Sequence, residues 1–280
     1  MKLPKPLAIT LLLSSPLGFA IDSQDFVKDN VFTQGIEGPT MYNGALYAVN
    51  YAQQGTIGRV DNMGKTSLFV RLPNDSVGNG LQFDSQGNLF IADYVNHNIL
   101  KVPAGSNKAE VFAHDSKMNQ PNDIAITQHG ALFASDPNWA NETGQLWRIN
   151  ADGSTHLLEK NMGTTNGVAV NNDNTKLYVN ESVQRIVWQY DLDDNLNISN
   201  KKVLIKFADH GLDGMRVNNQ GHVFITRYGA GKVLEVSPTG KLLNSYQLKG
   251  QHPTNLAFNE TQSKVYVTMQ KRGAIEVIEL

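Results

Sequence analysis

The chain has 280 residues, a formal net charge of −2, 18% charged residues and 40% hydrophobic residues. This length suits one large all-β domain and does not require a second one. The lack of a basic excess argues against nucleic-acid binding, and the lack of cysteine excludes a thiol nucleophile and a thiolate metal site.

The N-terminal segment has the pattern of a secretory signal peptide. Lys2 and Lys5 precede an apolar run at residues 7–13, and Gly18 and Ala20 stand at the small-residue positions of a cleavage site. The alternative is a buried first strand, but the two lysines and the prolines of this segment argue against it. The apolar run is too short to span a bilayer.

We therefore expect a signal peptide at residues 1–20 and a mature domain at residues 21–280. The mature protein is expected to be exported, to the periplasm or the extracellular space, and to have no membrane attachment after cleavage.

A short apolar strand recurs six times, and a turn pair such as Asn43-Gly44 precedes most copies. The copies are 42 to 46 residues apart. Their first large apolar residues are Leu46, Leu89, Leu132, Leu177, Val223 and Val265. A period in the forties built from strands and turns is typical of β-propeller blades with four strands each. The sequence therefore predicts an all-β, six-bladed propeller.

The sixth repeat lacks an outer strand, because the chain ends at Leu280 directly after the third strand of that repeat. Residues 26–33 have strand-like composition and no repeat of their own. We expect this N-terminal segment to supply the outer strand of the last blade, which closes the ring and removes an open sheet edge.

One polar residue recurs just before each repeated strand, at intervals of 42 to 47 residues. The six positions are Glu37, Asn79, Asn122, Asn166, Asp213 and Asn255. The first strand of each propeller blade lines the central channel, so these side chains are expected to converge on one axis.

Two of the six side chains are carboxylates, and the other four are amides. Carboxylates that converge in a narrow channel are costly unless a cation compensates them, and hard oxygen donors favour calcium over zinc. The alternative is that Asn-Gly and Asp-Gly pairs only form turns, which the blades need with or without a metal. Glu37 favours the metal site, because glutamate is not a typical turn residue.

Several ordered motifs resemble the senescence-marker-protein (regucalcin) and gluconolactonase family and the related diisopropyl fluorophosphatase. They are Glu37-Gly38-Pro39 with Gly44-Ala45-Leu46-Tyr47, then Asn119-Gln120-Pro121-Asn122-Asp123, Ser135-Asp136-Pro137, Thr165-Asn166-Gly167-Val168 and Leu212-Asp213-Gly214-Met215-Arg216. The likeness covers most of the mature chain.

The resemblance implies a divalent metal held by Glu37, Asn166 and Asp213. Calcium is the usual metal of the family, and zinc, manganese or magnesium are accepted by some members. Asn122 corresponds to a fourth ligand in the phosphatase branch and to a substrate contact in the regucalcin branch. Gln120 stands where the regucalcin branch has a lactone-binding arginine, so sugar-lactone specificity is open. We expect substrate contacts from Asn79, Gln120 and Asn122.

The expected reaction is hydrolysis of a small-molecule lactone or ester. The metal would polarise the carbonyl group, and Asp213 would act as general base, with direct nucleophilic attack by Asp213 less favoured. The loop at residues 136–143, which contains Trp139, is a candidate cover for the site. Tyr94 and Arg227 are candidate pocket residues, although each can also be an ordinary surface position.

Two other functions remain open. The protein could be a non-catalytic propeller that binds a ligand or partner around a structural ion, because fold alone does not separate an enzyme from a binding module. It could also be a phosphotriesterase-like hydrolase. A lyase or synthase of the strictosidine synthase type is disfavoured by Glu37 and Asp213.

Overall fold

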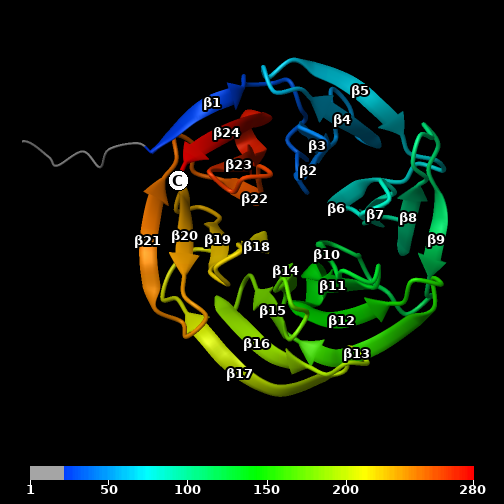
Figure 1. Ribbon diagram of the computed structural model, residues 1–280, viewed down its shortest axis with the longest axis vertical. Helices are drawn as coiled ribbons and strands as arrows, with labels where there is room; N and C mark the ends of the chain where they lie inside the picture. The colour runs from blue at the N-terminus through cyan, green and yellow to red at the C-terminus, as the bar shows by residue number, and fades with distance from the viewer. Residues whose placement is uncertain (1–21) are drawn as a thin grey trace, which may run out of the picture.

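The computed structural model describes residues 22–280, which form six antiparallel sheets of four strands each around a central channel (Figure 1). This confirms the prediction of a six-bladed β-propeller. The predicted signal peptide lies outside the described residues.

The strands of each blade are given from the channel outwards. Blade one has β2 (Thr40–Tyr42), β3 (Ala45–Val49), β4 (Thr56–Val60) and β5 (Thr66–Arg71). Blade two has β6 (Gly78–Phe83), β7 (Leu89–Asp93), β8 (Asn98–Val102) and β9 (Glu110–His114). Blade three has β10 (Ile124–Ile126), β11 (Leu132–Asn138), β12 (Thr143–Ile149) and β13 (Thr155–Met162).

Blade four has β14 (Thr165–Val170), β15 (Lys176–Glu181), β16 (Ile186–Leu192) and β17 (Ile198–Lys206). Blade five has β18 (Met215–Val217), β19 (Val223–Arg227), β20 (Lys232–Val236) and β21 (Leu242–Gln247). Blade six has β22 (Pro253–Phe258), β23 (Lys264–Met269), β24 (Ala274–Glu279) and β1 (Ser23–Val27).

The ring is closed by the N-terminal strand, as expected, because β1 pairs with β24 as the outer strand of blade six. The expected bounds, residues 26–33, were wrong. The strand ends at Val27 because the chain then turns through Asn30, which has a φ of 62°. Ser23 anchors the strand, since its hydroxyl donates a 2.5 Å hydrogen bond to the buried carboxylate of Glu276.

The hydrophobic core lies between neighbouring blades. The second strands are almost wholly buried, as in β3, β7 and β19, because a blade covers each of their faces. The outer strands are largely exposed, as in β21. The repeated apolar strand of the sequence is therefore the most deeply packed strand of each blade.

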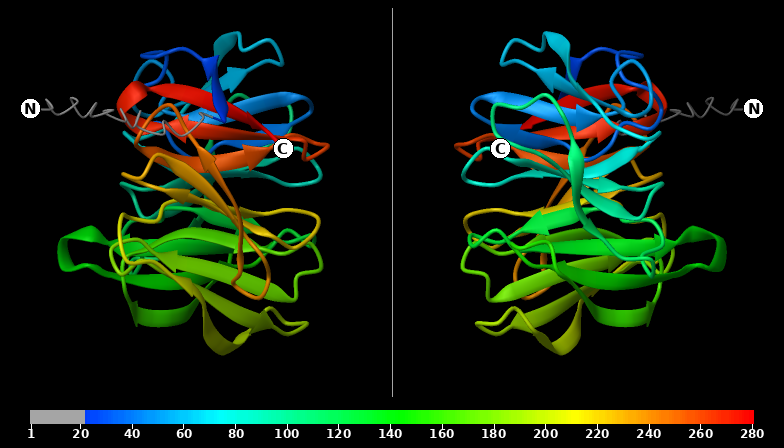
Figure 2. Two further views of the ribbon diagram at one scale, coloured as in Figure 1. Left: turned by 90° about the vertical axis from the view of Figure 1, so that its left-hand side faces the viewer. Right: turned by 90° about the vertical axis from the view of Figure 1, so that its right-hand side faces the viewer.

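Helical structure within residues 22–280 is limited to two short 3₁₀ turns, η1 (Trp139–Asn141) and η2 (Gln270–Arg272). No helix of this described part is long and apolar enough to cross a membrane. Figure 2 shows that the hairpin of β11 and β12, which carries η1, projects from one face of the ring.

Candidate active site

Five of the six recurring polar residues line one cavity of about 510 Å³ where the innermost strands begin. They are Glu37, Asn79, Asn122, Asn166 and Asp213. The sixth, Asn255, is buried and is not part of this lining, but it hydrogen-bonds to Glu37. The equivalence of the blades therefore brings together residues that are far apart in the chain.

The local backbone explains why these positions point into the channel. Asn79 and Asn166 do not lie in turns: each sits within an inner strand, where the pairing register shifts. Such bulges re-aim a side chain. The alternative interpretation, in which these two Asn-Gly pairs form turns, is therefore wrong.

Two glycines next to site residues allow neighbouring blades to approach closely. A Cβ atom at Gly38, which has a φ of 50°, would lie 2.0 Å from the carbonyl oxygen of Asn79. A Cβ atom at Gly167 would lie 2.4 Å from the carbonyl oxygen of Asp213, to which the Gly167 amide donates a hydrogen bond of 3.1 Å. Side chains at these positions would push the blades apart.

Glu37 and Asp213 form a buried carboxylate pair that is joined by a hydrogen bond. Burial and the nearby charge of Asp123 raise the pKa of Glu37 to about 7. Burial and the charge of Glu37 raise the pKa of Asp213 well above its ordinary value. The pair therefore needs either a proton or a cation.

Asn166 supplies a further oxygen. Its side chain hydrogen-bonds to Asp213, while its Oδ1 atom is buried and has no hydrogen-bond partner among the described residues. A buried oxygen without a partner costs about 1–3 kcal/mol, so its retention calls for an explanation.

This donor set fits a hard divalent cation. Residues 22–280 hold no cluster of three or more His, Cys, Asp or Glu side chains that could bind a metal. The two carboxylates would therefore need amide oxygens to complete a site, and Asn166 offers one. Oxygen-only donors favour calcium, magnesium or manganese over zinc.

The remaining predicted substrate contacts differ in position. Asn79 and Asn122 line the cavity. Gln120 is not part of the lining; its backbone amide donates a 2.6 Å hydrogen bond to Asp136. The Asp136 carboxylate also accepts from the Trp147 indole at 2.9 Å, so it ties the segment before β10 to the body of blade three.

Aromatic and amide side chains form the cavity walls. Tyr94 and Trp139 line the cavity, as the sequence suggested. Arg227 does not: its guanidinium packs on the Phe207 ring at 4.0 Å and binds Asp209 at 2.8 Å. The next residue, Tyr228, lines the cavity instead.

The sequence interpretation missed Tyr228 and three amides of the wall, Asn50, Gln54 and Gln270. The hydroxyl of Tyr228 donates a 2.6 Å hydrogen bond to Gln270. Tyr94 and Tyr228 both come directly after the second strand of a blade. This equivalent position is the sequence signal that could have found Tyr228.

Comparison with known proteins decides the family. A sequence model of the SMP-30/gluconolactonase/LRE-like region matches residues 36–271. The chain belongs to this family. The matched region includes all six recurring polar residues.

Among individual members, a gluconolactonase from Zymomonas mobilis is 28% identical over 216 residues, which cover 68% of this chain and 60% of that protein. The diisopropyl-fluorophosphatase of Loligo vulgaris is 25% identical over 284 residues, which cover 89% of this chain and 90% of that protein. The chain spans about half the length of two other curated members that it matches, 52% and 46%.

A solved structure has the same fold. It is a calcium-binding regucalcin from Agrobacterium tumefaciens, with a TM-score of 0.79 and 20% identity over 92% of this chain and 93% of that chain.

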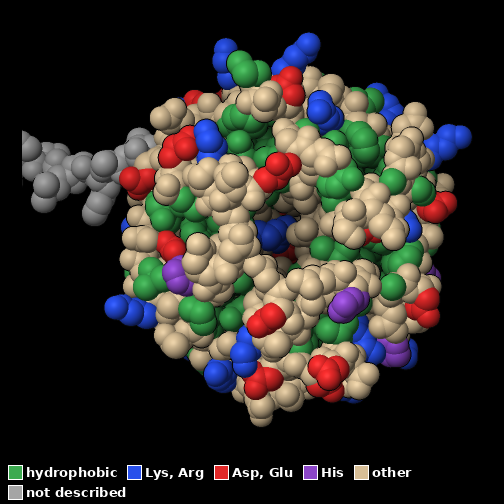
Figure 3. Space-filling view, in the orientation of Figure 1, with side chains coloured by type: hydrophobic (Ala, Val, Ile, Leu, Met, Phe, Trp, Pro, Cys, Tyr) green, Lys and Arg blue, Asp and Glu red, His purple; other side chains and the backbone are tan. Residues whose placement is uncertain are grey.

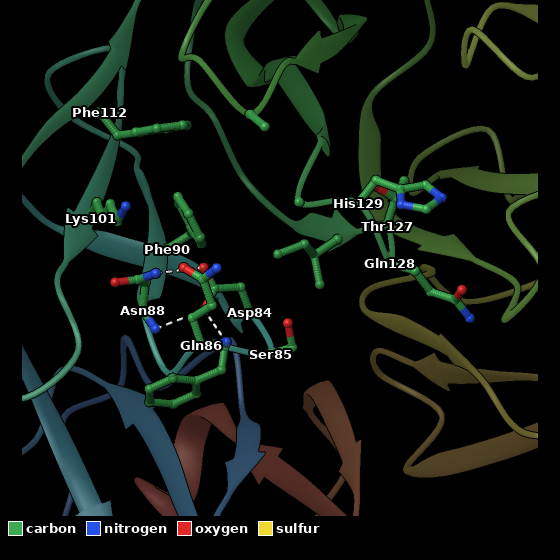
Figure 4. A pocket seen from close by; sticks show the side chains of 14 residues that line it. Asp84, Ser85, Gln86, Asn88, Phe90, Lys101, Phe112, Thr127, Gln128 and His129 are labelled. Atoms are coloured by element: carbon green, nitrogen blue, oxygen red, sulfur yellow. Dashed lines mark hydrogen bonds between the residues drawn. The ribbon is translucent and has the colours of Figure 1, made fainter.

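A second cavity of about 480 Å³ lies between blades two and three, at the opposite ends of their inner strands (Figure 4). Its polar groups are engaged locally. Asp84 accepts hydrogen bonds from the backbone of Gln86 and from both the backbone and the side chain of Asn88. The ammonium group of Lys101 lies 5.6 Å from the centre of the Phe90 ring.

Proposed function

We propose that this protein is a divalent-metal-dependent hydrolase that opens a lactone ring in the cavity above Glu37 and Asp213, with calcium as the preferred metal. The observation that carries the proposal is the pair of buried carboxylates beside Oδ1 of Asn166, which has no hydrogen-bond partner within residues 22–280. Family members named for lactone hydrolysis support this choice of reaction.

In this proposal Glu37, Asn166 and Asp213 hold the cation. Asn122 is either a fourth ligand or a substrate contact. When bound, a divalent cation supplies Lewis-acid stabilisation of negative charge on a carbonyl oxygen and lowers the pKa of a nearby water.

The chain's own residues perform the proton transfers. Asp213 accepts a proton from the attacking water as the water oxygen bonds to the carbonyl carbon. Asp213 then returns the proton to the ring oxygen as the ring C–O bond breaks, and the product is a hydroxy acid. If Asn122 is a substrate contact and not a ligand, its amide group donates a hydrogen bond to a substrate oxygen. Attack by Asp213 itself on the carbonyl carbon is the less favoured route.

The walls of the cavity suit an uncharged, ring-shaped substrate. Tyr94, Trp139 and Tyr228 offer aromatic surface, and Gln54 and Gln270 offer amide groups. Within the described chain, no lysine or arginine is part of the lining, so no basic side chain pairs with a phosphate or sulfonate group.

The deciding experiment is a pH-stat assay of the mature protein with neutral aldonolactones and simple aliphatic lactones. We expect acid release that stops with chelator and returns with calcium, and a calorimetric calcium titration with one site. A protein that binds calcium but turns over no lactone would support the non-catalytic propeller.

Phosphotriester hydrolysis is the second candidate. It is favoured by the match to diisopropyl-fluorophosphatase, which covers 89% of this chain. The same assay with diethyl 4-nitrophenyl phosphate separates the two reactions. A kcat/KM for the phosphotriester above that for every lactone would replace the lactonase proposal.

Export of the mature protein is part of the proposal. It rests on the charge and apolar pattern of residues 1–20.

A further inference from the structure

An ion pair lies in the central channel next to the candidate metal site. Arg216 follows Asp213 by three residues, and Asp123 directly follows Asn122. Nη1 of Arg216 lies 3.0 Å from Oδ2 of Asp123, and Nη2 lies 3.4 Å from Oδ1. The Asp123 side chain is 1% exposed and the Arg216 side chain 13%. In Figure 3, basic side-chain atoms are visible inside the central opening.

The pair is held by four blades. Asp123 of blade three also accepts hydrogen bonds from the backbone amides of Ile124, at 3.0 Å, and of Val168 in blade four, at 3.3 Å. Arg216 comes from blade five. Gln82 of blade two, with its amide oxygen facing the guanidinium, accepts from Nε and Nη2 of Arg216 at 3.2 Å each. This network positions both charges rigidly.

Asp123 is close enough to both cavity carboxylates for its charge to act on them. Glu37, Asp213 and Asp123 together carry three negative charges when ionised, and Arg216 carries one positive charge. The group therefore presents a net charge of −2, which a single divalent cation matches. Without Arg216 the net charge would be −3.

We propose that Arg216 is a positioning residue that neutralises Asp123 and thereby sets the affinity of the cavity for a divalent cation. This inference rests on the proposed metal site. Arg216 and Asp123 are not themselves ligands in this proposal. Replacing Arg216 and replacing Asp123 should therefore change the calcium affinity in opposite directions.

The test measures calcium affinity by calorimetry and the melting temperature in chelator for the full mature chain. In Arg216→Met the uncompensated Asp123 should tighten calcium binding about five- to tenfold. In Asp123→Asn the unpaired guanidinium should weaken calcium binding by a similar factor. The double variant Asp123→Asn/Arg216→Met should return close to the wild-type affinity, and Arg216→Lys should stay within about threefold of it.

Melting temperatures in chelator measure how much the ion pair between Arg216 and Asp123 stabilises the metal-free protein. Each single variant should melt below the wild type, because it leaves one buried charge unpaired, and the double variant should regain part of the loss. A purely structural role would weaken calcium binding in both single variants. Changes of calcium affinity in the same direction in both variants therefore overturn the inference. If Arg216→Met does not fold, Asp123→Asn and the double variant decide together. Weaker binding in Asp123→Asn that the double variant restores supports the proposal, and weaker binding that persists in the double variant contradicts it.

Failure of the inference is distinguishable from failure of the proposed function. A wild-type protein that binds no calcium overturns the metal site itself. A wild-type protein that binds calcium, with unchanged affinity in both single variants, overturns only the role of Arg216.

Discussion

Glu37 of blade one and Asp213 of blade five hydrogen-bond to each other at the base of the cavity, although three further blades separate them along the chain. Two buried carboxylates in contact destabilise a metal-free fold when both are ionised. Their contact in one cavity should therefore have a measurable cost in the stability of the metal-free protein.

Replacing Asp213 by asparagine should separate function from stability. Lactone turnover should fall by a factor of roughly 10² to 10⁴, the usual effect of losing a general base, and calcium affinity should fall with it. The metal-free protein should melt at a higher temperature than the wild type, because the repulsion from Glu37 is gone. Asp75→Asn is the matched control, since Asp75 is exposed on a loop. Wild-type turnover in the Asp213 variant would remove the proposed base.

The metal-free protein should lose stability as the pH rises. The folded-state pKa of Glu37, about 7, is higher than the ordinary value of 4.5, so the folded state binds the proton more tightly than the unfolded state. The stability that this proton contributes is fully present below pH 4.5 and is lost as the pH rises through 7.

Melting temperatures in chelator between pH 4.5 and 8 measure this effect. Saturating calcium should reduce the loss above pH 7, because the cation takes the place of the proton. The variant Glu37→Gln should show a weaker dependence in this range. An identical pH dependence in Glu37→Gln would assign the effect to other groups.

Truncating Trp139 should weaken substrate binding with little effect on the chemical step. The η1 turn brings this side chain to the cavity wall, far along the projecting β11–β12 hairpin. Trp139→Ala should therefore raise KM several-fold with a nearly constant kcat, since it removes uniform binding. Trp188→Ala is the control, because Trp188 lies on β16 and packs under Lys201. Equal KM values for the two variants would exclude Trp139 from substrate contact.

The closure of the ring should depend on Ser23. Its hydroxyl hydrogen-bonds to the fully buried Glu276 carboxylate, and Ser23→Ala leaves that acceptor with one donor fewer. The expected cost is about 1–3 kcal/mol in the free energy of unfolding. Urea denaturation measures it, with Gln24→Ala as the control because Gln24 is exposed on the same strand. At low temperature, Ser23→Ala should hydrolyse the lactone with unchanged kcat and KM, because β1 is the outermost strand of blade six.

Export should remove the first twenty residues. Expression of the full chain in a bacterial host with a secretion pathway should yield a mature protein whose first residue is Ile21, which N-terminal sequencing detects. Gly18→Arg should block cleavage, because the site needs small residues. A cytoplasmic protein that retains Met1 would contradict the proposal.

The six-fold architecture could be predicted from the sequence because every blade has the same short sequence pattern. Each blade repeats an apolar strand, a turn pair and a polar residue at nearly the same interval, and equivalent places in a propeller meet at one axis. This logic was enough to identify Glu37, Asn79, Asn122, Asn166 and Asp213 as neighbours.

Other features were decided only by the tertiary structure, because they depend on side-chain direction and on contacts between blades. Tyr228, which follows the end of β19, lines the cavity, whereas the Arg227 side chain packs on Phe207 and binds Asp209. Asn255 keeps the repeat but hydrogen-bonds to Glu37 and does not line the cavity. The pairing of Asp123 with Arg216 joins charges from blades three and five, and a one-dimensional pattern does not encode which partner a buried charge meets across a closed ring.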